Sequence, residues 1–448
     1  MNKDIKMEEI ISLCKRRGFI YQGSDVYGGL AGTWDYGPLG VELKRNIEEL
    51  WWKSFVSRND NIYGVDAAIL MNQKVWKASG HTETFADPLV EDLVTKKRYR
   101  ADHLLKEAGQ EVDGLTNDEL NNLIKDKKIK SPDGNELSEV REFNMMFKTN
   151  VGPVVDEGSI SYLRPETAQG IFTNYKNVVD SFYPNMPFGI AQIGKAFRNE
   201  ISPRDFIFRS REFNQMEIEY FVDPNNWQES FDKLLKDIHI FLEKVLELPT
   251  DKIHELEVPE SDRAHYSKRT IDIEFDYPIG REELLGLAYR TDFDLMNIEK
   301  ASGKSMEYRP KNGDEPYVPH VIEPSFGLER LVMAVFTAFY VNDGDRKYLK
   351  LPNQLAPVRA LVSPLLKNKP ELVKKAKMVY EMLNSSPELI GKVMWDESGN
   401  IGKRYAKADE IGIPECIVVD FDTLEDDTVT VRNRDTTKQE RVKISELV

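Results

Sequence analysis

The stretch 188–221 carries the side chains of this sequence that are best suited to chemistry. Two alternating runs flank an arginine-rich connection, which predicts an antiparallel hairpin with a long loop. Since side chains alternate between the two faces of a strand, Arg198 shares a face with the small residues Gly194 and Ala196. The return strand places the ring of Phe213 among carboxylates. A solvated face can have this composition, but the small residues Gly194 and Ala196 leave room for a ligand on this face. A guanidinium binds phosphate well and a flat ring suits a planar group.

Two further charged residues lie at predicted helix starts. Glu166 lies in the run RPETAQG, where its ordinary role would be a favourable interaction with the helix N-terminus. Arg330 lies one turn into a helix opened by Gly327, where the positive helix end could help to bind phosphate. The alternative for Arg330 is an ordinary ion pair with Glu329 or Glu323.

Composition indicates a globular protein of two or three domains. The chain has 448 residues, of which 40% are apolar and 31% charged, and no window approaches the ~18 apolar residues of a membrane helix. Its start lacks the apolar core of a signal peptide. Cys14 and Cys416 lie at opposite ends, so neither a disulfide framework nor a CxxC metal site is expected, and a reducing cytosol is the default.

The net charge of −15 is unevenly distributed. Residues 346–448 contain 18 Lys and Arg and 16 Asp and Glu, whereas the rest contains 43 and 60. An RNA partner would therefore have to bind to local basic surfaces, because the overall field is repulsive. Charge by itself neither supports nor excludes RNA.

Periodicity predicts the elements that would position the hairpin. Helices are expected at residues 5–17, 41–55, 227–248 and 327–340, strands at 270–275, 283–288 and 319–324, and a strand followed by a helix at 161–175. Residues 91–150 are charged and show little strand signal, so we expect an insertion docked on the main domain. From Leu351 onward strands alternate with helices and end in a hairpin, which predicts a small α/β domain with a mostly parallel centre.

Several separated runs resemble one family. FRNE at 197–200, followed by RSREF at 209–213, resembles the second signature of class II aminoacyl-tRNA synthetases. The continuation FNQME resembles the dimeric type of glycyl-tRNA synthetase, and EPSFGLER at 323–330 resembles the third class II signature. The glycine-rich run 27–40, otherwise an ordinary packed turn, then leads into the first signature, a helix and strand at the dimer interface. The resemblance covers nearly the whole chain.

The resemblance implies a fold class and a division into domains. Residues 1–345 would form an α+β catalytic domain built on an antiparallel sheet, with an inserted subdomain at about 91–150. Residues 351–448 would form an α/β anticodon-binding domain. Many relatives carry paired cysteines for zinc where the insertion begins. Here that run is VEDLVTKKRYRADH, so no structural zinc is expected.

The resemblance also implies an activity. The enzyme would activate glycine with ATP and Mg²⁺ to glycyl-adenylate, and transfer the glycyl group to the 3′ end of tRNA(Gly). It would act as a cytoplasmic homodimer with no membrane partner. A glycine pocket must reject every side chain, and since no amino acid is smaller than glycine, no editing domain should be needed.

The same resemblance implies roles for individual residues. Arg198 and Arg330 would act in catalysis, and Glu283 would be the Mg²⁺ ligand. ATP would be bound by Arg198, Asn199, Glu200, Phe208, Arg209, Ser210, Arg211, Glu212, Phe213, Glu283, Leu284, Gly327, Leu328, Glu329 and Arg330. Glycine would be bound by Arg100, Glu166, Phe213, Asn214, Gln215, Met216, Glu217, Glu323, Pro324, Ser325, Phe326 and Gly327.

Two other functions fit the sequence less well. One is a non-catalytic nucleic-acid-binding accessory protein that reuses the synthetase fold. Such proteins typically lose the phosphate-binding arginines, whereas this chain keeps Arg198, Arg209 and Arg330. The other is a ligase for serine or threonine, but the FNQME and RPETAQG runs favour glycine.

Overall fold

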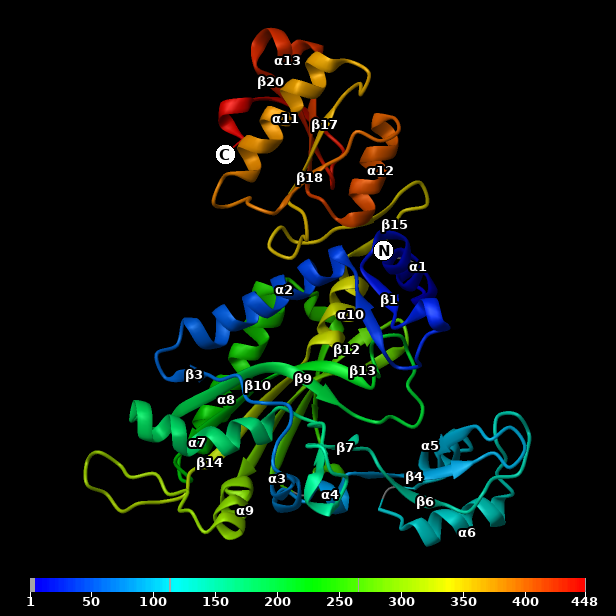
Figure 1. Ribbon diagram of the computed structural model, residues 1–448, viewed down its shortest axis with the longest axis vertical. Helices are drawn as coiled ribbons and strands as arrows, with labels where there is room; N and C mark the ends of the chain where they lie inside the picture. The colour runs from blue at the N-terminus through cyan, green and yellow to red at the C-terminus, as the bar shows by residue number, and fades with distance from the viewer. Residues whose placement is uncertain (1–4, 113, 265, 448) are drawn as a thin grey trace.

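The computed structural model describes residues 5–112, 114–264 and 266–447. Figure 1 shows a central sheet with helices above and below it, an insertion at the lower right, and a C-terminal domain at the top. No helix in these ranges is both long and apolar enough to cross a membrane.

The central sheet has seven strands in the order β11-β12-β13-β14-β10-β9-β3. All neighbours are antiparallel except the edge strand β3, which pairs with β9 in parallel. The strands are β3 (Ile62–Gly64), β9 (Phe188–Phe197), β10 (Glu212–Val222), β11 (Ile253–Glu257), β12 (Arg269–Tyr277), β13 (Gly280–Thr291) and β14 (His320–Gly327). This antiparallel sheet confirms the predicted hairpin and the predicted fold class of the main domain.

The register of β9, β10 and β14 brings the predicted site residues together. Phe213 is opposite Ala196, and Glu217 is opposite both Gln192 on β9 and Ser325 on β14. Side chains with the same parity therefore form one polar sheet face, while the alternate residues point into the apolar core on the other.

The apolar face of the sheet is covered by α1 (Met7–Arg17), α2 (Pro38–Trp52), α8 (Trp227–Ile240) and α10 (Leu328–Phe339). Residues 328–337 of α10 are all buried except Arg330, because this nearly all-apolar helix lies between α2 and the sheet. On the opposite face, α7 (Ala168–Phe182) and α9 (Phe293–Ser302) pack on one end of the strands with a second apolar cluster. Figure 1 shows α2 and α10 above the sheet and α7 and α9 below it. The uncovered part of the polar face is left for the site.

The insertion has a small sheet of its own, in the order β5-β4-β6, although the sequence shows little strand signal there. Its strands and helices are β4 (Ala86–Glu91), β5 (Arg98–Arg100), α5 (Ala101–Glu107), α6 (Asn117–Lys127) and β6 (Arg141–Asn144), and they enclose a separate apolar cluster. The strands were hard to predict because they are short and mostly half-exposed or exposed, so that little apolar alternation marks them.

The C-terminal domain has a five-stranded sheet in the order β18-β17-β19-β20-β21. β17 is parallel to both β18 and β19, and β20 and β21 form the closing hairpin, which confirms the predicted α/β architecture. The elements are β17 (Ala360–Pro364), α11 (Pro370–Asn384), β18 (Val393–Trp395), α12 (Ile401–Ile411), β19 (Glu415–Val419), α13 (Phe421–Asp426), β20 (Thr428–Asn433) and β21 (Gln439–Lys443). The short elements β18 and α13 were not predicted.

The two domains are joined by polar contacts and by a shared stretch of core. Leu351 and Leu355 are buried in the main core, so the boundary between the two cores falls after residue 355 and not at 351. Asn46 of α2 donates to the carbonyls of Leu355 and Ala356. The remaining elements are β1 (Ile20–Gln22), β2 (Trp34–Tyr36), α3 (Gln73–Ala78), α4 (His81–Thr84), β7 (Lys148–Asn150), β8 (Ile160–Tyr162), β15 (Tyr340–Asn342) and β16 (Lys347–Leu349).

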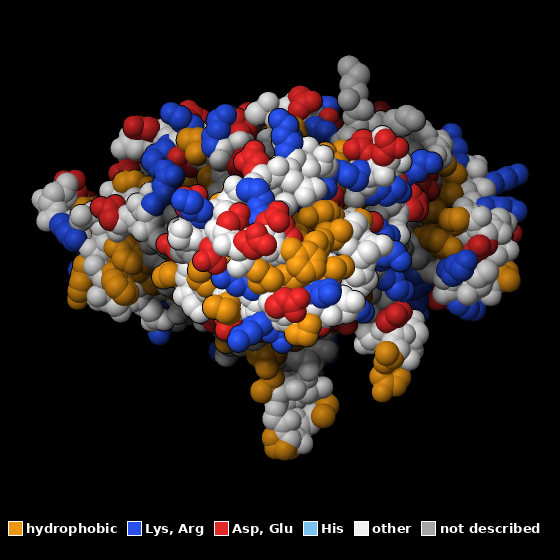
Figure 2. All heavy atoms as spheres, turned by 90° about the horizontal axis from the view of Figure 1, so that it is seen from above, with side chains coloured by type: hydrophobic (Ala, Val, Ile, Leu, Met, Phe, Trp, Pro, Cys, Tyr) orange, Lys and Arg blue, Asp and Glu red, His pale blue; other side chains and the backbone are white. Residues whose placement is uncertain are grey.

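Figure 2 looks down on the C-terminal end of the molecule. Acidic and basic side chains are interspersed on this face, with a group of hydrophobic side chains near its centre. Exposed apolar residues of the C-terminal domain include Met378, Ile390, Phe421 and Leu424. The face shown carries no patch of one sign, so any RNA contact made here must be local, as the overall charge suggests.

Candidate active site

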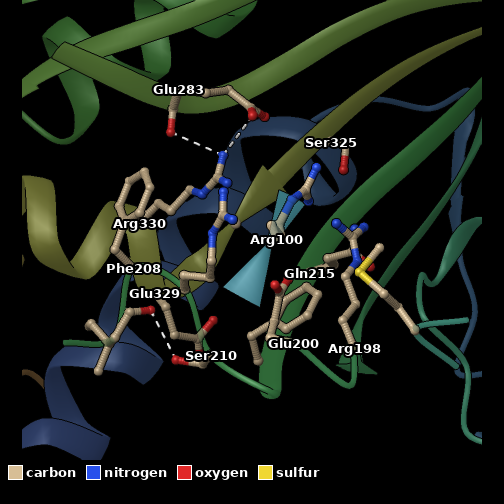
Figure 3. Close-up of a pocket in the computed structure, with 15 residues that line it drawn as sticks. Arg100, Arg198, Glu200, Phe208, Ser210, Gln215, Glu283, Ser325, Glu329 and Arg330 are labelled. Atoms are coloured by element: carbon tan, nitrogen blue, oxygen red, sulfur yellow. Dashed lines mark hydrogen bonds and ion pairs between the residues drawn. The ribbon is translucent and has the colours of Figure 1, made fainter. Parts of the chain in front are cut away.

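A cavity of about 330 Å³ opens on the polar face of the central sheet (Figure 3). It brings together thirteen of the predicted site residues, which are Arg100, Arg198, Glu200, Phe208, Arg209, Ser210, Phe213, Gln215, Glu283, Ser325, Gly327, Glu329 and Arg330. A second cavity of about 270 Å³ adjoins it and shares Arg198, Gln215, Glu283 and Ser325. Glu166, Glu217 and Glu323 line the second cavity, so the predicted nucleotide and amino-acid residues lie in two connected spaces.

Arg198 lies between two aromatic rings at the centre of this face. Its guanidinium carbon is 5.3 Å from the ring centre of Phe213 and 5.5 Å from that of Phe85, and its Nε donates to the Pro165 carbonyl at 3.1 Å. These contacts hold the side chain in place by cation–π attraction and leave its terminal nitrogens for a ligand. Phe85 was not predicted, because it lies far from the hairpin in sequence.

The room for a ligand that was expected beside Gly194 is filled by the side chain of Arg164. A Cβ atom there would collide with the guanidinium of Arg164. Arg164 is buried, and donates to the carbonyls of Lys195 at 2.7 Å and Ala67 at 2.8 Å. Gly194 is therefore needed to admit Arg164, and the expectation that it leaves room for a ligand was wrong.

Arg330 forms an ion pair, but with neither of the predicted partners. Its Nη1 lies 2.9 Å from Glu283 Oε2 and also donates to the Glu283 carbonyl at 3.0 Å (Figure 3). The charge of Arg330 is the main cause that lowers the pKa of Glu283. Glu329 instead accepts from the backbone and side-chain nitrogens of Asn214, both at 2.8 Å.

Glu217 is buried and bonded at both oxygens. Oε1 accepts from Ser325 Oγ at 2.7 Å and from Gln215 Nε2 at 2.9 Å, and Oε2 accepts from the Thr167 amide at 3.0 Å and from the Thr167 hydroxyl. Burial and the charge of Glu166 raise the pKa of Glu217 above its ordinary value. A cation arriving here would stabilise the ionised form of Glu217.

Glu166 faces the same space and is supported by a residue that was not predicted. His81 Nε2 lies 3.5 Å from Glu166 Oε1, and the other ring nitrogen of His81 is 2.7 Å from Ser79 Oγ. Burial alone would raise the pKa of Glu166, but the charges of His81, Arg290 and Arg198 lower it below its ordinary value. His81 is 8% exposed, so it can support Glu166 but is itself mostly shielded from a ligand.

Arg290 is a second buried group that sequence reasoning missed. Its nitrogens donate to both oxygens of Asp294 at 2.9 and 3.0 Å, and to both oxygens of Glu323 at 2.9 and 3.0 Å. Even so, burial and the charges of Glu217 and Glu166 raise the pKa of Glu323 to about 8. The charged run RTDFDL was the only sequence signal for this cluster.

Four predicted site residues direct their side chains away from the site. Because alternate residues of a strand point to opposite faces, the side chains of Met216, Leu284 and Phe326 lie in the apolar core, and that of Leu328 is buried with them. Only their backbone could meet a ligand. Five others line neither cavity, namely Asn199, Arg211, Glu212, Asn214 and Pro324. Of these, Arg211 donates to the Glu200 carbonyl, and Glu212 pairs with Lys195.

Arg100 reaches the cavity from the insertion. It forms ion pairs of 2.7 Å with Asp87 and with Asp102, and Figure 3 shows it beside the cavity. One element of the insertion therefore contributes to the site built on the main sheet.

The residues near Glu283 fit Mg²⁺. Asp272 of β12 lines the second cavity with Glu283, and burial together with the charge of Glu283 raises the pKa of Asp272 to about 7. A divalent cation beside both carboxylates would relieve their repulsion, and Mg²⁺ prefers oxygen ligands. No group of three or more His, Cys, Asp or Glu in the described ranges could hold a metal alone.

Comparisons with known proteins identify the family. Residues 147–339 match the tRNA synthetase class II core domain (G, H, P, S and T), and residues 359–448 match an anticodon binding domain. A glycine–tRNA ligase of Clostridium acetobutylicum is 48% identical over 100% of this chain and 98% of its own length. Those of Deinococcus radiodurans and Chlorobaculum tepidum are each 46% identical over 98% of this chain, and over 97% and 98% of their own lengths. The chain belongs to the glycine–tRNA ligase family.

Membership of the glycine–tRNA ligase family confirms the resemblance drawn from FRNE, FNQME and EPSFGLER. It also confirms the prediction of an aminoacyl-tRNA synthetase with a class II core and an anticodon binding domain. The accessory-protein alternative is not supported, because relatives named as ligases match at nearly full length.

Proposed function

We propose that this protein is a glycine–tRNA ligase that forms glycyl-adenylate from glycine and ATP and then esterifies tRNA(Gly). The observation that carries the proposal is the junction of the two cavities. Phosphate-binding arginines line one cavity, and the second ends in buried carboxylates that suit an ammonium group. The family of its relatives supports the same activity.

The proposed chemistry needs positioning and charge stabilisation. A glycine carboxylate oxygen attacks the α-phosphorus of ATP, and pyrophosphate leaves. Arg198 would bind the α-phosphate and stabilise the charge that develops on it, while Arg330 and Arg209 would bind the distal phosphates. In the second step a hydroxyl of the terminal tRNA ribose attacks the glycyl carbonyl carbon, and AMP leaves.

Glycine would bind through its ammonium group. Glu217 and Glu166 supply charge, and the Ser325 hydroxyl lies 2.7 Å from Glu217, so that it also narrows the space beside the α-carbon. Glu323 lies on the same cavity wall. A rigid wall excludes larger side chains at high energetic cost, which supports selection of glycine.

Mg²⁺ would be held by Glu283, with Asp272 as a second oxygen donor. When bound, the ion would neutralise phosphate charge and orient the triphosphate. Glu283 is paired with Arg330, so a cation held by Glu283 and the Arg330 guanidinium would both attract the phosphates, which the Glu283 carboxylate alone would repel.

The homodimer and the cytoplasmic location are also proposals. The edge strand β3 supports a dimer, because the ring of its Tyr63 contacts that of Phe182, with the ring centres 5.1 Å apart. The Phe182 side chain is 63% exposed and that of its neighbour Tyr183 is 68% exposed. A reducing compartment is supported by Cys14 and Cys416, which are both free and buried.

ATP–pyrophosphate exchange across a panel of amino acids tests the activity. We expect exchange with glycine, and little with alanine, serine or threonine. In the Glu217→Gln variant the shape is kept but the charge is lost. Since a hydrogen bond to a charged group contributes about 1.5–3 kcal/mol, the KM for glycine should rise more than tenfold with a much smaller change in that for ATP. Exchange that does not depend on glycine, or an unchanged glycine KM in the variant, would contradict the assignment.

A further inference from the structure

A cluster of buried carboxylates lies beside the proposed ammonium position, with one guanidinium among them. It comprises Glu217 and Glu219 of β10, Glu323 of β14, Arg290 of β13 and Asp294 of α9, with Glu166 just before α7, and each is 8% exposed or less. Glu219 lies two residues beyond Glu217 on the same strand, so the two side chains share one face of the sheet. The role proposed for the site does not use Glu219.

Glu219 differs from the other carboxylates in its partners. Arg290 donates to both Asp294 and Glu323, His81 and Gln169 contact Glu166, and Glu217 accepts four hydrogen bonds. Glu219 is fully buried, and neither of its oxygens has a hydrogen-bond partner among the residues that the structure describes. An ionised carboxylate without donors is very costly to bury, whereas the neutral acid is much less so.

The neighbours of Glu219 favour the neutral form from several sides. Glu217 lies on its own strand, Glu323 on β14 and Asp294 on α9, and Arg290, whose nitrogens already bind two carboxylates, lies on β13. The neighbours on β9 carry no charge, since Ile190 is directly opposite and Gln192 is diagonal to it. Burial and then the charge of Glu323 raise the pKa of Glu219 well above its ordinary value, although Arg290 acts in the opposite direction.

We infer that Glu219 carries a proton in the glycine-free protein and that glycine binding releases this proton to solvent. This inference rests on the proposed function, because the ammonium group of glycine is the charge that enters. The ammonium group would pair with Glu217, which lies two residues from Glu219 on the same strand, in the cavity that Glu166 and Glu323 also line. The acid form of Glu219 then loses H⁺ to the buffer and remains as a carboxylate, while the positive charge that enters with glycine compensates the charge it gains.

A consequence is that glycine affinity depends on pH. When binding releases one proton, a higher pH favours the complex, and the Kd for glycine falls up to tenfold for each pH unit in the range where the free cluster is protonated. Glycine itself keeps its ammonium charge near neutral pH, since an α-amino group of this kind is protonated there. The proton therefore comes from the protein.

Isothermal titration calorimetry of the full-length protein with glycine tests the inference. Titrations at pH 7 in phosphate, HEPES and Tris buffers, which differ in ionisation enthalpy, give the number of protons released. We expect the wild type to release about one proton more than Glu219→Gln, with glycine binding retained. Any proton released by Glu323, whose pKa is about 8, is common to both proteins and cancels in this difference. The exposed Glu229→Gln on α8 is the control, and should release as many protons as the wild type.

A second variant, Glu219→Met, replaces the titrating carboxyl group with an apolar side chain. It allows the same measurement if Glu219→Gln fails to fold. Measurable glycine binding with no proton release by the wild type would overturn the inference and leave the proposed function standing. Equal release by the wild type and both Glu219 variants would also overturn it. No glycine binding by the wild type, together with no glycine-dependent exchange, would overturn both proposals.

Discussion

At the residue scale, the site depends on charged groups that are fixed by neighbours from distant parts of the chain. Arg198 is enclosed by Phe213 and Phe85, and Glu166 is supported by His81. The hairpin could be predicted to hold Arg198 because strand alternation fixes which side chains share a face. Phe85 and His81 could not be predicted as parts of the site, because nothing local in the sequence shows that the segment before the insertion folds against the sheet.

Loss of Arg198 should abolish most of the first reaction step. In Arg198→Ala the positive charge proposed to stabilise the α-phosphate in the transition state is absent. Removal of one such contact commonly lowers the rate by ~10²–10³. Glycine-dependent pyrophosphate exchange measures the loss, and circular dichroism checks that the fold is retained. Near-normal exchange would remove Arg198 from the mechanism.

Loss of His81 should make glycine binding more sensitive to acid. His81 lowers the pKa of Glu166, so in His81→Phe that pKa rises and the carboxylate becomes neutral at a higher pH than in the wild type. A neutral Glu166 loses the charge-assisted hydrogen bond proposed to the ammonium group, which contributes about 1.5–3 kcal/mol, so the glycine KM should rise more than tenfold where Glu166 is protonated. The rise should grow as the pH falls from 8 to 6.

We would measure the glycine KM of His81→Phe and of the wild type between pH 6 and 8. This comparison tests whether His81 keeps Glu166 ionised. Ser79→Ala is the matched control, because it keeps the imidazole beside Glu166 while removing the hydroxyl 2.7 Å from its other nitrogen. Parallel pH profiles for His81→Phe and the wild type would show that His81 has only a structural role.

At the element scale, long periodic segments were predictable and short ones were not. The hairpin of β9 and β10, the helices α8 and α10 and the alternation of strands and helices in the C-terminal domain follow from apolar periodicity. The insertion's sheet, β18 and α13 are too short for a period to appear. The sequence could not show that Leu351 and Leu355 pack in the main core, because they look like any other apolar residues until their neighbours are known.

The two domains should separate in function. A chain of residues 1–357 keeps Leu351 and Leu355 in the main core, and should retain glycine-dependent pyrophosphate exchange. Without the anticodon binding domain, its kcat/KM for tRNA charging should fall by about 100-fold, which corresponds to ~2.7 kcal/mol of lost binding. Both activities are measured on the same preparation, so that exchange reports on the core. Equal charging by the shortened and full-length proteins would refute this division of labour.

At the scale of the whole molecule, an apolar surface at the sheet edge marks the proposed dimer contact. Phe182 and Tyr183 at the end of α7 are exposed beside Tyr63 of β3. Large contiguous apolar patches on a protein surface often mark sites of contact with another protein. Few local signals in the sequence could have indicated this surface, because exposure depends on how α7 meets the edge strand.

A charge at this surface should weaken the dimer. Phe182→Asp should cost about 2 kcal/mol or more of association free energy, a roughly thirty-fold rise in the dimer Kd, as for other central interface residues. Sedimentation equilibrium measures the change. Leu366→Asp, at an exposed apolar position of the C-terminal domain, should associate like the wild type. If both variants behave alike, the contact lies elsewhere.

The contacts of α1 have a consequence for biosynthesis. Arg16 and Arg17, near the beginning of the chain, pair with Glu410 of α12, which lies almost 400 positions later. At about 5–20 residues per second, a ribosome needs roughly 20–80 s to make the intervening polypeptide. The helix α1 is therefore synthesised that long before Glu410, the residue with which its arginines pair. Docking of the two domains is therefore completed only after α12 has left the ribosomal tunnel.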